Sequence, residues 1–443
     1  MKKGLKIAIA VILIVFICFL LHENFYTENK VTGIKLTSNI LGNTQYTVEV
    51  AFENKDDKET HCLLSNTGAA SGNWIKIKDG ICSFNVAYGE YALFIRDKLG
   101  NVREYKDDYV IDVVADEDKY VMFKGMDDTI TYSMLRIGGA KDSLEFKSEN
   151  TNLVGVTGNI VYGIDYGVSN VDILYNDKIV ESVEIVVTSL IRNRYSNEER
   201  SYVSCGQFTK EDNDLVDQIL FERVFEAGEG TRAGVLAAAR FITLEFNYRI
   251  PYFYENGRLE YYEPYIYVDG EGRYYHKGLY LSTDRYEDLV ATFVGPATWG
   301  CNLKNFTNAY PYVSGQLYPN GFDCSGFISW VLYNGGMNIG DIGAGTDYEH
   351  FDYTDVGVQK YITNDLVYSG EIKAGDLIGL DGHIAIIVGI DDYNFYIAES
   401  LPTTGGVAIT TVSKERLAYS MYKYVMLMDS VYNGDGNNYT VMW

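Results

Sequence analysis

A cysteine and a histidine, about 60 residues apart, are the residues of this sequence best suited to covalent chemistry. Cys324 follows Asp323, a good helix N-cap, and begins a segment whose apolar residues recur at helical spacing up to the Gly335-Gly336 pair. The pattern places Cys324 in the first turn of a helix. The exposed N–H groups and the positive dipole end there stabilise a thiolate, which is the nucleophilic form of cysteine.

His383 stands at the start of a predicted strand. A continuous apolar run follows it as far as Gly389, and the chain returns over residues 395–400 after a polar turn. If the paired residue numbers of this hairpin sum to 782 or 784, Glu399 lies on the same face as His383 and can accept its imidazole N–H. An odd sum places Ser400 opposite His383 instead.

Together, Cys324, His383 and Glu399 supply the nucleophile, the base and the orienting group that covalent acyl transfer needs. Taken singly, two of these residues have a plainer interpretation. Cys324 could be a buried, unreactive cysteine or half of a disulfide, and His383 a hydrogen-bonded polar residue at the edge of a strand. His350, beside Glu349, is a rival base, but it lies in a polar stretch without a strand to aim it. We therefore expect His383 to be the base.

Three motifs in this region resemble those of a known family. They are Asp323-Cys324-Ser325-Gly326-Phe327, Ala374-Gly375-Asp376-Leu377 and the run from His383 to Gly389. Their order and spacing are similar to those of the NlpC-type cysteine peptidases, papain-like bacterial cell-wall hydrolases, over about residues 200–430. The resemblance implies an α+β papain-like domain with helices packed on an antiparallel sheet, in which Cys324 is the nucleophile and His383 the general base.

The resemblance also implies further residues near the reacting carbonyl. The family commonly has a histidine or another polar residue as third catalytic member, and this sequence offers Glu399. A Pro-Tyr-x-x-Gly-Gly-like stretch tends to precede the cysteine and places its tyrosine near the oxyanion; Pro251-Tyr252 resembles its start and Trp299-Gly300 its end. The residues between them would be an insertion that forms a lid or a wall of the cleft. The candidates for contact with the substrate or the oxyanion are Tyr252, Asp323, Ser325 and Trp299.

The implied reaction is hydrolysis of an amide bond in a peptidoglycan stem peptide. The Cys324 thiolate would attack the carbonyl, the Cys324 N–H would help to hold the oxyanion, and His383 would protonate the departing amine before water hydrolyses the thioester. No cofactor is needed. Two other function classes stay open: a surface adhesin or wall-binding protein without catalytic turnover, and a related Cys-His amidase or acyltransferase.

The N-terminus predicts export. Lys2, Lys3 and Lys6 precede an uninterrupted apolar run from Ile7 to Leu21, and no Ala-x-Ala cleavage pattern follows. A helix of this length, at ~1.5 Å per residue, is close to the hydrocarbon thickness of a bilayer. We expect residues 1–30 to be a single-pass transmembrane anchor in the cell membrane, with the C-terminal bulk extracellular. Cleavage would instead make the protein secreted.

Two β-rich stretches follow the anchor. Residues 46–52 alternate between large apolar and smaller or polar side chains, as in a strand with one buried face. Segments 144–148 and 183–187 resemble strands of bacterial immunoglobulin-like surface domains. Neither stretch concentrates histidine, cysteine or paired carboxylates. We therefore expect two all-β immunoglobulin-like sandwiches, at residues 31–115 and 116–192, which serve as spacers or adhesive modules.

The remaining chain divides into a linker and a larger domain. A polar strip predicts a linker at residues 193–208, and the domain with Cys324 occupies residues 209–443. Thr209 with Asp212 predicts the start of a helix, and Thr231 can cap a second one. The whole chain is thus predicted to be multidomain.

The cysteines outside the anchor are odd in number. Cys62 and Cys82 lie in one strand-rich stretch and could form a disulfide; the others are Cys205, Cys301 and Cys324. If the others pair within the chain, at least one thiol stays free.

Neither a metal ion nor a nucleic acid is expected as a partner. No cysteine or histidine cluster has zinc spacing, and the closing Asn433–Asn438 segment lacks the spacing and terminal glutamate of a calcium loop, so we interpret it as a turn. The 443 residues include 61 acidic and 37 basic side chains, and this excess would repel a phosphate backbone. We expect a monomer whose partners are peptidoglycan and the membrane.

Overall fold

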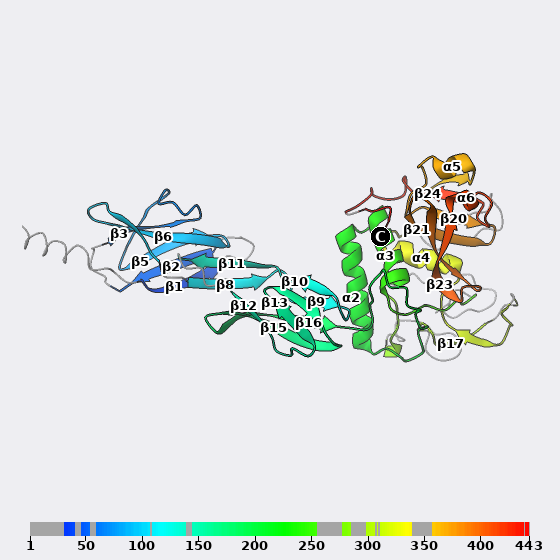
Figure 1. Ribbon diagram of the computed structural model, residues 1–443, viewed down its shortest axis with the longest axis horizontal. Coiled ribbons are helices and arrows are strands. Elements are labelled where there is room, and N and C mark those ends of the chain that lie inside the picture. Colours follow the sequence, from blue (N-terminus) through cyan, green and yellow to red (C-terminus); the bar gives the residue numbers. More distant parts are fainter. Residues whose placement is uncertain are drawn as a thin grey trace, which may run out of the picture. The chain divides into compact units, whose positions relative to one another are not determined.

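The computed structural model divides the chain into two compact units, unit 1 (Met1–Val187) and unit 2 (Thr188–Trp443) (Figure 1). The predicted anchor at residues 1–30 lies outside the described residues. No helix in the described part of the chain is long and apolar enough to cross a membrane. The structure describes residues 31–39, 46–53, 59–106, 109–138, 144–254, 277–284, 298–305, 308, 311–338, 357–437 and 439–442.

Unit 1 begins with two sheets that share one apolar core. Alternation along one sheet turns Val48 and Val50 inward, as predicted, and Leu93 of the other sheet belongs to the same core. A disulfide joins Cys62 of one sheet to Cys82 of the other, the pair expected from the sequence. One sheet has the order β1 (Val31–Asn39), β2 (Tyr46–Phe52), β5 (Ile81–Val86); the other has the order β4 (Ile75–Lys76), β3 (Glu59–Ser65), β6 (Gly89–Asp97), β11 (Tyr132–Ile137), β8 (Tyr109–Ala115), with β7 (Val102–Glu104) also paired to β6.

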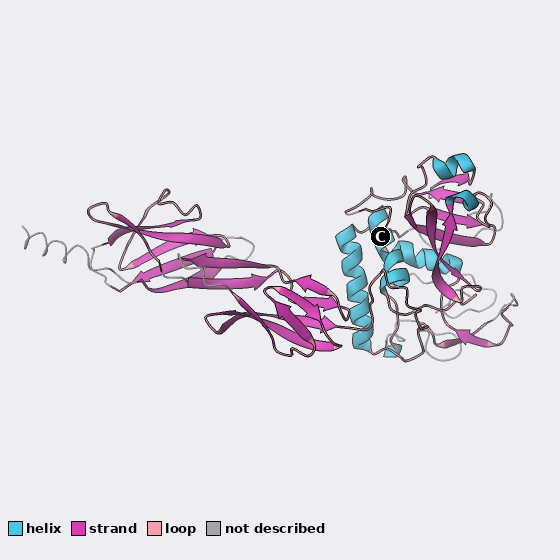
Figure 2. Cartoon of the chain, viewed as in Figure 1, coloured by secondary structure: helices cyan, strands magenta, loops and turns pink. Residues whose placement is uncertain are grey.

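A second pair of sheets in unit 1 shares a separate apolar core. Val161 of one sheet and Val171 and Ile185 of the other are fully buried in it. Figure 2 shows strands and loops, and no helix, in the described part of unit 1. One sheet has the order β12 (Glu145–Ser148), β15 (Gly167–Tyr175), β16 (Lys178–Val187), β9 (Lys119–Met122); the other has the order β10 (Asp127–Thr129), β14 (Ile160–Gly163), β13 (Val154–Thr157).

Strand β11 connects the two halves of unit 1 in a way that the sequence did not predict. Its residues fall within the expected second sandwich at 116–192, yet it pairs with β6 and β8 of the first pair of sheets. At one end of this pairing, Ala115 and Tyr132 contribute to the second core, whereas Leu135 and Ile137 of β11 lie in the first. Strand pairing therefore crosses the expected boundary after residue 115.

Unit 2 combines an antiparallel sheet with helices, in the α+β arrangement that the resemblance implied. Helices α3 and α4 both contact strand β21 of the sheet (Figure 1). The sheet has the order β19 (Val358–Tyr361), β24 (Tyr424–Leu427), β20 (Leu377–Leu380), β21 (His383–Ile390), β22 (Asn394–Leu401), β23 (Gly406–Ser413). The other elements are α2 (Lys210–Ala227), α3 (Arg232–Arg240), the π-helix η1 (Phe241–Glu245), α4 (Cys324–Asn334), α5 (Asn364–Tyr368), α6 (Lys414–Leu417) and the paired strands β17 (Asn302–Lys304) and β18 (Leu317–Pro319).

The predicted starts of the first two helices of unit 2 are confirmed. Thr209 and Asp212 cap α2 reciprocally, because each side chain accepts the backbone N–H of the other residue. Thr231 caps α3. The closing segment is a turn that packs on the start of the same helix, where the Gly434 carbonyl accepts the N–H of Arg232 at 3.0 Å.

A buried ion pair joins α3 to the segment that leads into the sheet. Arg232 and Asp376 are each 1% exposed, and the guanidinium lies 2.9 Å from the carboxylate. Arg232 also lies 2.6 Å from Asp429 and donates to the Ala374 carbonyl at 2.9 Å. Asp376 belongs to one of the motifs behind the family resemblance, and its carboxylate serves this structural network.

Residues 188–208 pack on unit 2 rather than forming the expected linker at 193–208. Ile191 forms a β-bridge with Phe246, and the guanidinium of Arg200 donates to three carbonyls in and after η1. Burial lowers the pKa of Arg200 to about 10. The charge of Arg200, within the expected linker, is thus satisfied by carbonyl oxygens inside the unit.

Candidate active site

Helix α4 begins with Cys324, in the position that the sequence predicted. Asp323 caps the helix by accepting the N–H of Gly326 at 2.7 Å, and the Ser325 hydroxyl donates to the same carboxylate oxygen at 3.2 Å. Asp323 and Ser325, which were expected near the substrate, thus stabilise the start of the helix. Cys324 is the only free cysteine among the described residues, because the other four form two disulfides.

The sulfur of Cys324 lies against the start of β21. Sγ is 3.9 Å from the Gly382 carbonyl oxygen, and the N–H of Ile384 hydrogen-bonds to the sulfur, so the two contacts flank His383. Burial raises the pKa of the Cys324 thiol to about 12, and the Asp323 carboxylate adds to the increase. The helix start was expected to favour the thiolate, but burial outweighs it. The thiol therefore needs a neighbouring proton acceptor to react at neutral pH.

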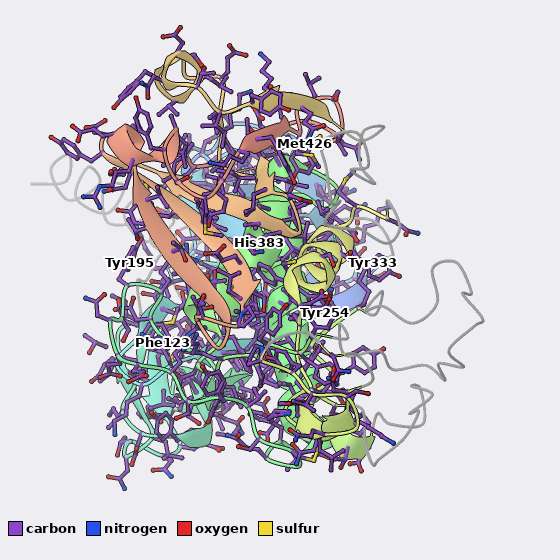
Figure 3. The ribbon with its side chains drawn as sticks, turned by 90° about the vertical axis from the view of Figure 1, so that its right-hand side faces the viewer. Phe123, Tyr195, Tyr254, Tyr333, His383 and Met426 are labelled. Atoms are coloured by element: carbon purple, nitrogen blue, oxygen red, sulfur yellow. A yellow bond between two sulfur atoms is a disulfide. The ribbon has the colours of Figure 1, made fainter. Side chains whose placement is uncertain are left out.

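His383 and Glu399 form a buried pair across neighbouring strands. Ile386 pairs with Ala398, which is the predicted register with a sum of 784, and it brings Glu399 to the face of His383. Nε2 of His383 lies 2.7 Å from Oε2 of Glu399, and the two residues are 6% and 0% exposed. His383 lies where the sheet faces α4 (Figure 3). Among the described residues, no hydrogen bond to Nδ1 of His383 is present.

Tyr422 is a site residue that sequence reasoning missed. Its hydroxyl donates to the same Oε2 of Glu399 at 2.8 Å, and its side chain is 1% exposed. Burial raises the pKa of Tyr422, so the phenol stays a donor at neutral pH. Tyr422 lies just before β24, which is separated from β22 by two strands of the sheet. No local spacing in the sequence connects residues so arranged.

A group of tyrosines lies beside Cys324. Burial raises the pKa of Tyr252, and the nearby Asp323 and Cys324 add to the increase. The backbone of Tyr252 also forms a β-bridge with Phe322, two residues before the nucleophile. Tyr252 therefore lies close to Cys324. The group comprises Tyr252, Tyr254, Tyr312 and Tyr318, whose neighbouring ring centroids lie between 4.7 and 6.3 Å apart.

Trp299 lies in the core and does not face a substrate. It is 1% exposed, and its ring centroid is 4.2 Å from that of Phe322. The expected substrate contact is therefore corrected: the indole packs behind the segment that leads to Cys324. His350 and Glu349, the rival base and its neighbour, lie outside the described residues, as do residues 255–276 and 285–297 of the expected insertion.

Hydrogen bonds from two sides fix the segment that enters α4. The N–H of Phe322 donates to the Pro251 carbonyl at 3.0 Å, and the Ser400 hydroxyl donates to the Phe322 carbonyl at 2.8 Å. Gly321 permits this close approach, because a Cβ there would lie 1.8 Å from the Pro251 oxygen. Ser400 follows Glu399 on β22. One strand thus holds both the carboxylate beside His383 and the backbone ahead of Cys324.

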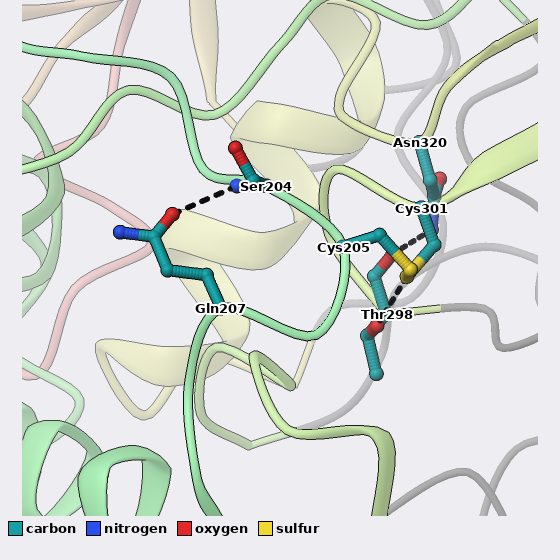
Figure 4. The surroundings of a disulfide bond; sticks show 6 residues. All are labelled: Ser204, Cys205, Gln207, Thr298, Cys301 and Asn320. Carbon is teal, nitrogen blue, oxygen red and sulfur yellow. Dashed lines mark hydrogen bonds between the residues drawn. A yellow bond between two sulfur atoms is a disulfide. The ribbon is translucent and has the colours of Figure 1, made fainter.

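A second disulfide, Cys205–Cys301, joins two loops near this segment (Figure 4). The Cys301 carbonyl accepts the N–H of Asn320 at 2.7 Å, four residues before Cys324. The Thr298 hydroxyl lies 3.0 Å from the Cys301 sulfur. The disulfide therefore connects the start of unit 2 to the chain that leads into α4.

The arrangement supplies the parts of an acyl-transfer site. It contains one free thiol, an imidazole oriented by a buried carboxylate, and backbone N–H groups around the sulfur. Within the described ranges, no group of three or more histidine, cysteine, aspartate or glutamate side chains could hold a metal ion.

Comparison with known proteins identifies the domain that carries this site. The model of the NlpC/P60 family matches residues 309–426, a range that includes Cys324, His383 and Glu399. Unit 2 therefore contains an NlpC-type domain, which is a domain of the cell-wall peptidase type. The match covers about a quarter of the chain, and Tyr252 lies outside it.

Other comparisons give low similarity. No curated protein matches the chain. A crystal structure of the C-terminal 282-residue fragment of intimin, in complex with the intimin-binding domain of the translocated intimin receptor, is 13% identical and covers 40% of this chain and 68% of that one, with a TM-score of 0.20. A structure of domains 1–6 of the surface layer protein SbsC is 14% identical and covers 36% of each chain, with a TM-score of 0.16.

Proposed function

We propose that unit 2 is a cysteine peptidase that hydrolyses amide bonds in the stem peptides of peptidoglycan. One observation carries the proposal: the only free thiol of the described residues, Cys324, contacts the start of the strand on which His383 is hydrogen-bonded to the buried Glu399. The NlpC-type domain supports peptidoglycan as the substrate class.

Acylation begins with transfer of the Cys324 proton to Nδ1 of His383. Sγ then forms a bond to the carbonyl carbon, and the C=O electron pair moves to the oxygen. The tetrahedral intermediate collapses when the imidazolium gives its proton to the departing amine, which breaks the C–N bond and leaves a thioester. Throughout, Glu399 accepts a hydrogen bond from the Nε2–H of His383, which stabilises the imidazolium and fixes the tautomer.

Backbone N–H groups at the start of α4 are suited to bind the oxyanion. The first N–H groups of a helix have no intrahelical acceptors, and those of Cys324 and Ser325 already approach the sulfur. The Tyr252 hydroxyl is a further candidate donor. In deacylation, His383 takes a proton from water, the hydroxide attacks the thioester carbon, and the proton passes to the departing thiolate of Cys324.

The experiment that tests the proposal is mass spectrometry of purified muropeptides after incubation with the full chain under reducing conditions. We expect new fragments whose masses identify the broken bond. The Cys324→Ala variant should produce no fragments, although its thermal stability equals that of the wild-type protein. Added amine acceptors would be incorporated into the products only if the protein were an acyltransferase. If muropeptides stayed intact while Cys324 was alkylated rapidly, another acyl substrate would be indicated; a slowly alkylated Cys324 would favour a binding protein.

We also propose that an N-terminal anchor holds the enzyme at the outer face of the cell membrane. The support is the lysine-rich start and the apolar run from Ile7 to Leu21. The full chain should sediment with membranes, whereas a chain that lacks residues 1–30 should stay in the supernatant. Equal distribution of the two chains would refute the anchor.

A further inference from the structure

Tyr422 adds a third hydrogen-bonded member to the buried pair beside Cys324. Its hydroxyl donates to Oε2 of Glu399 at 2.8 Å, and the same oxygen lies 2.7 Å from Nε2 of His383. Oε1 of Glu399 has no hydrogen-bond partner among the described residues, although Glu399 is fully buried. Both donors to this carboxylate therefore converge on one oxygen.

We propose that Tyr422 is a positioning residue: its hydroxyl holds the carboxylate of Glu399 turned toward His383, and so keeps the imidazole oriented to take the proton of Cys324. The inference rests on the proposed function, because it assigns Tyr422 a part in the Cys324–His383 reaction. A fully buried carboxylate stays charged only when donors replace the water that it has lost. Tyr422 and His383 are the side chains that do so here.

The Tyr422 hydroxyl acts on the Cys324 thiol through Glu399. Without it, Nε2 of His383 is the only described donor to the Glu399 carboxylate. A carboxylate that is held less firmly stabilises the imidazolium less well, and the imidazolium forms together with the Cys324 thiolate. Thiolate formation should therefore move to higher pH.

Other ionisable groups surround the site on neighbouring elements. Asp323 and Tyr252 lie near Cys324 on the loops ahead of and beside α4. Tyr424 on β24 lies near both Cys324 and Asp381. These four groups are unchanged when only the Tyr422 hydroxyl is removed. A difference between the wild-type protein and Tyr422→Phe therefore reports that hydroxyl.

The test is the rate at which iodoacetamide alkylates Cys324 as a function of pH, measured on the full chain by mass spectrometry. This assay needs no substrate. We expect the acid limb of the Tyr422→Phe profile to lie about one pH unit above that of the wild-type protein, since a hydrogen bond to a charged group is lost. The matched control is Tyr432→Phe, which removes another buried hydroxyl, one that donates to the Gly375 carbonyl at 2.6 Å. Its profile should be that of the wild-type protein.

The Glu399→Gln background distinguishes a role of Tyr422 in positioning Glu399 from a role in packing alone. Because Tyr422 acts through Glu399, Tyr422→Phe should cause no additional shift in the Glu399→Gln background. A shift that persists in that background overturns the inference, and so does a Tyr422→Phe profile equal to that of Tyr432→Phe. If Tyr422→Phe does not fold, Tyr422→Met also lacks the donor and replaces it in the same comparison.

The same assay distinguishes failure of this inference from failure of the proposed function. His383→Ala should slow the alkylation of Cys324 at neutral pH. If it does not, Cys324 and His383 are not a reacting pair, and both proposals fail. If it does, while Tyr422→Phe behaves like its control, only the role of Tyr422 is refuted.

Discussion

The two units of this chain bury different kinds of side chain. Of the 21 polar or charged side chains that are buried among the described residues, only Ser65, Arg136 and Ser169 lie in unit 1, and the other 18 lie in unit 2. The cores of unit 1 are instead filled by apolar side chains from paired sheets. Apolar burial is not directional, whereas a hydrogen bond fixes a distance and an angle. The unit with the buried polar groups is therefore the one that can hold reacting atoms in place.

Buried polar groups in unit 2 also hold segments that have no regular structure. The N–H groups of Gly278 and Leu279 donate to Asn334 and Asp217, at 2.8 and 2.7 Å, and the indole of Trp330 donates to the Gly278 carbonyl. Side chains of α2 and α4 thus replace the strand partners that this segment lacks. In unit 1, the backbone groups are mostly satisfied by pairing between strands. We therefore expect unit 2 to respond to single polar substitutions and unit 1 to tolerate them.

The largest expected effect comes from the same substitution made at one histidine in each unit. His383→Ala should lower the rate of amide hydrolysis by about 10²- to 10⁴-fold, the usual contribution of a general acid–base residue. His61→Ala in β3 of unit 1 should leave the rate unchanged. Burial and the nearby Arg96 and Lys76 lower the pKa of His61, so it is uncharged at neutral pH. The measurement is the initial rate of muropeptide cleavage by each full-length variant.

Equal losses in the two histidine variants would contradict the assigned division between the units, because unit 1 would then contribute to catalysis. Circular dichroism of both variants serves as the control for folding. A loss confined to His383→Ala would assign the reaction to unit 2.

A smaller but still large effect is expected for stability when one arginine is replaced in each unit. Arg232→Met leaves the carboxylate of Asp376 buried without its counter-charge, which should destabilise unit 2 by about 3–5 kcal/mol. Arg96→Met in unit 1 removes a guanidinium that lies 4.7 Å from the centroid of the Trp74 ring. Its cost should be about 0.5–1 kcal/mol.

Urea unfolding of the full chain checks this pair of values. Three of the four tryptophans lie in unit 2 and Trp74 lies in unit 1, so tryptophan fluorescence mainly follows unit 2. Similar midpoints for Arg232→Met and the wild-type protein would show that the apolar neighbours of Asp376, and not the ion pair, hold α3 on the sheet. The double variant Arg232→Met/Asp376→Leu should recover part of the loss, because it removes the unpaired charge.

Local patterns in the sequence were enough to predict several elements, including the helix that begins with Cys324. Alternation predicted strand β2, the Thr209–Asp212 box predicted the start of α2, and Asp323 predicted the start of α4. The side-chain period of two in a strand limited the pairing of β21 with β22 to a few registers, and one of them places Glu399 beside His383. These predictions succeeded because each depends on residues that are close in sequence or on one hairpin.

Contacts between distant segments were not predictable in the same way. Tyr422 reaches Glu399 only because of the strand order of the sheet. Strand β11 pairs within the first pair of sheets, although β9 and β10, which precede it in the chain, belong to the second pair. Trp299 resembled a substrate contact from its place in a motif, but a large ring is also a good filler for the space behind Phe322. Composition and spacing do not distinguish such roles, because they depend on how the elements pack.

The smallest expected effect on the reaction rate comes from the two disulfides. Cys205→Ala/Cys301→Ala opens a loop with a sequence separation of 96 residues, and Cys62→Ala/Cys82→Ala one of 20. The chain-entropy model gives losses of about 5 and about 3 kcal/mol, so both pairs stabilise the protein. Only the first should lower the hydrolysis rate, by about 10-fold, since small displacements of reacting groups slow catalysis. The measurement is the rate at a temperature where both variants are folded.

The reason for this difference lies in where each disulfide connects to the chain. Cys301 accepts a hydrogen bond from Asn320, and the following residues lead directly to Cys324, whereas Cys62 and Cys82 join two sheets of unit 1. If the Cys205→Ala/Cys301→Ala variant kept the full rate, the bonds of Phe322 to Pro251 and Ser400 would suffice to position the nucleophile. A fall in rate without a change in KM would show instead that the disulfide adjusts the thiol and leaves substrate binding intact.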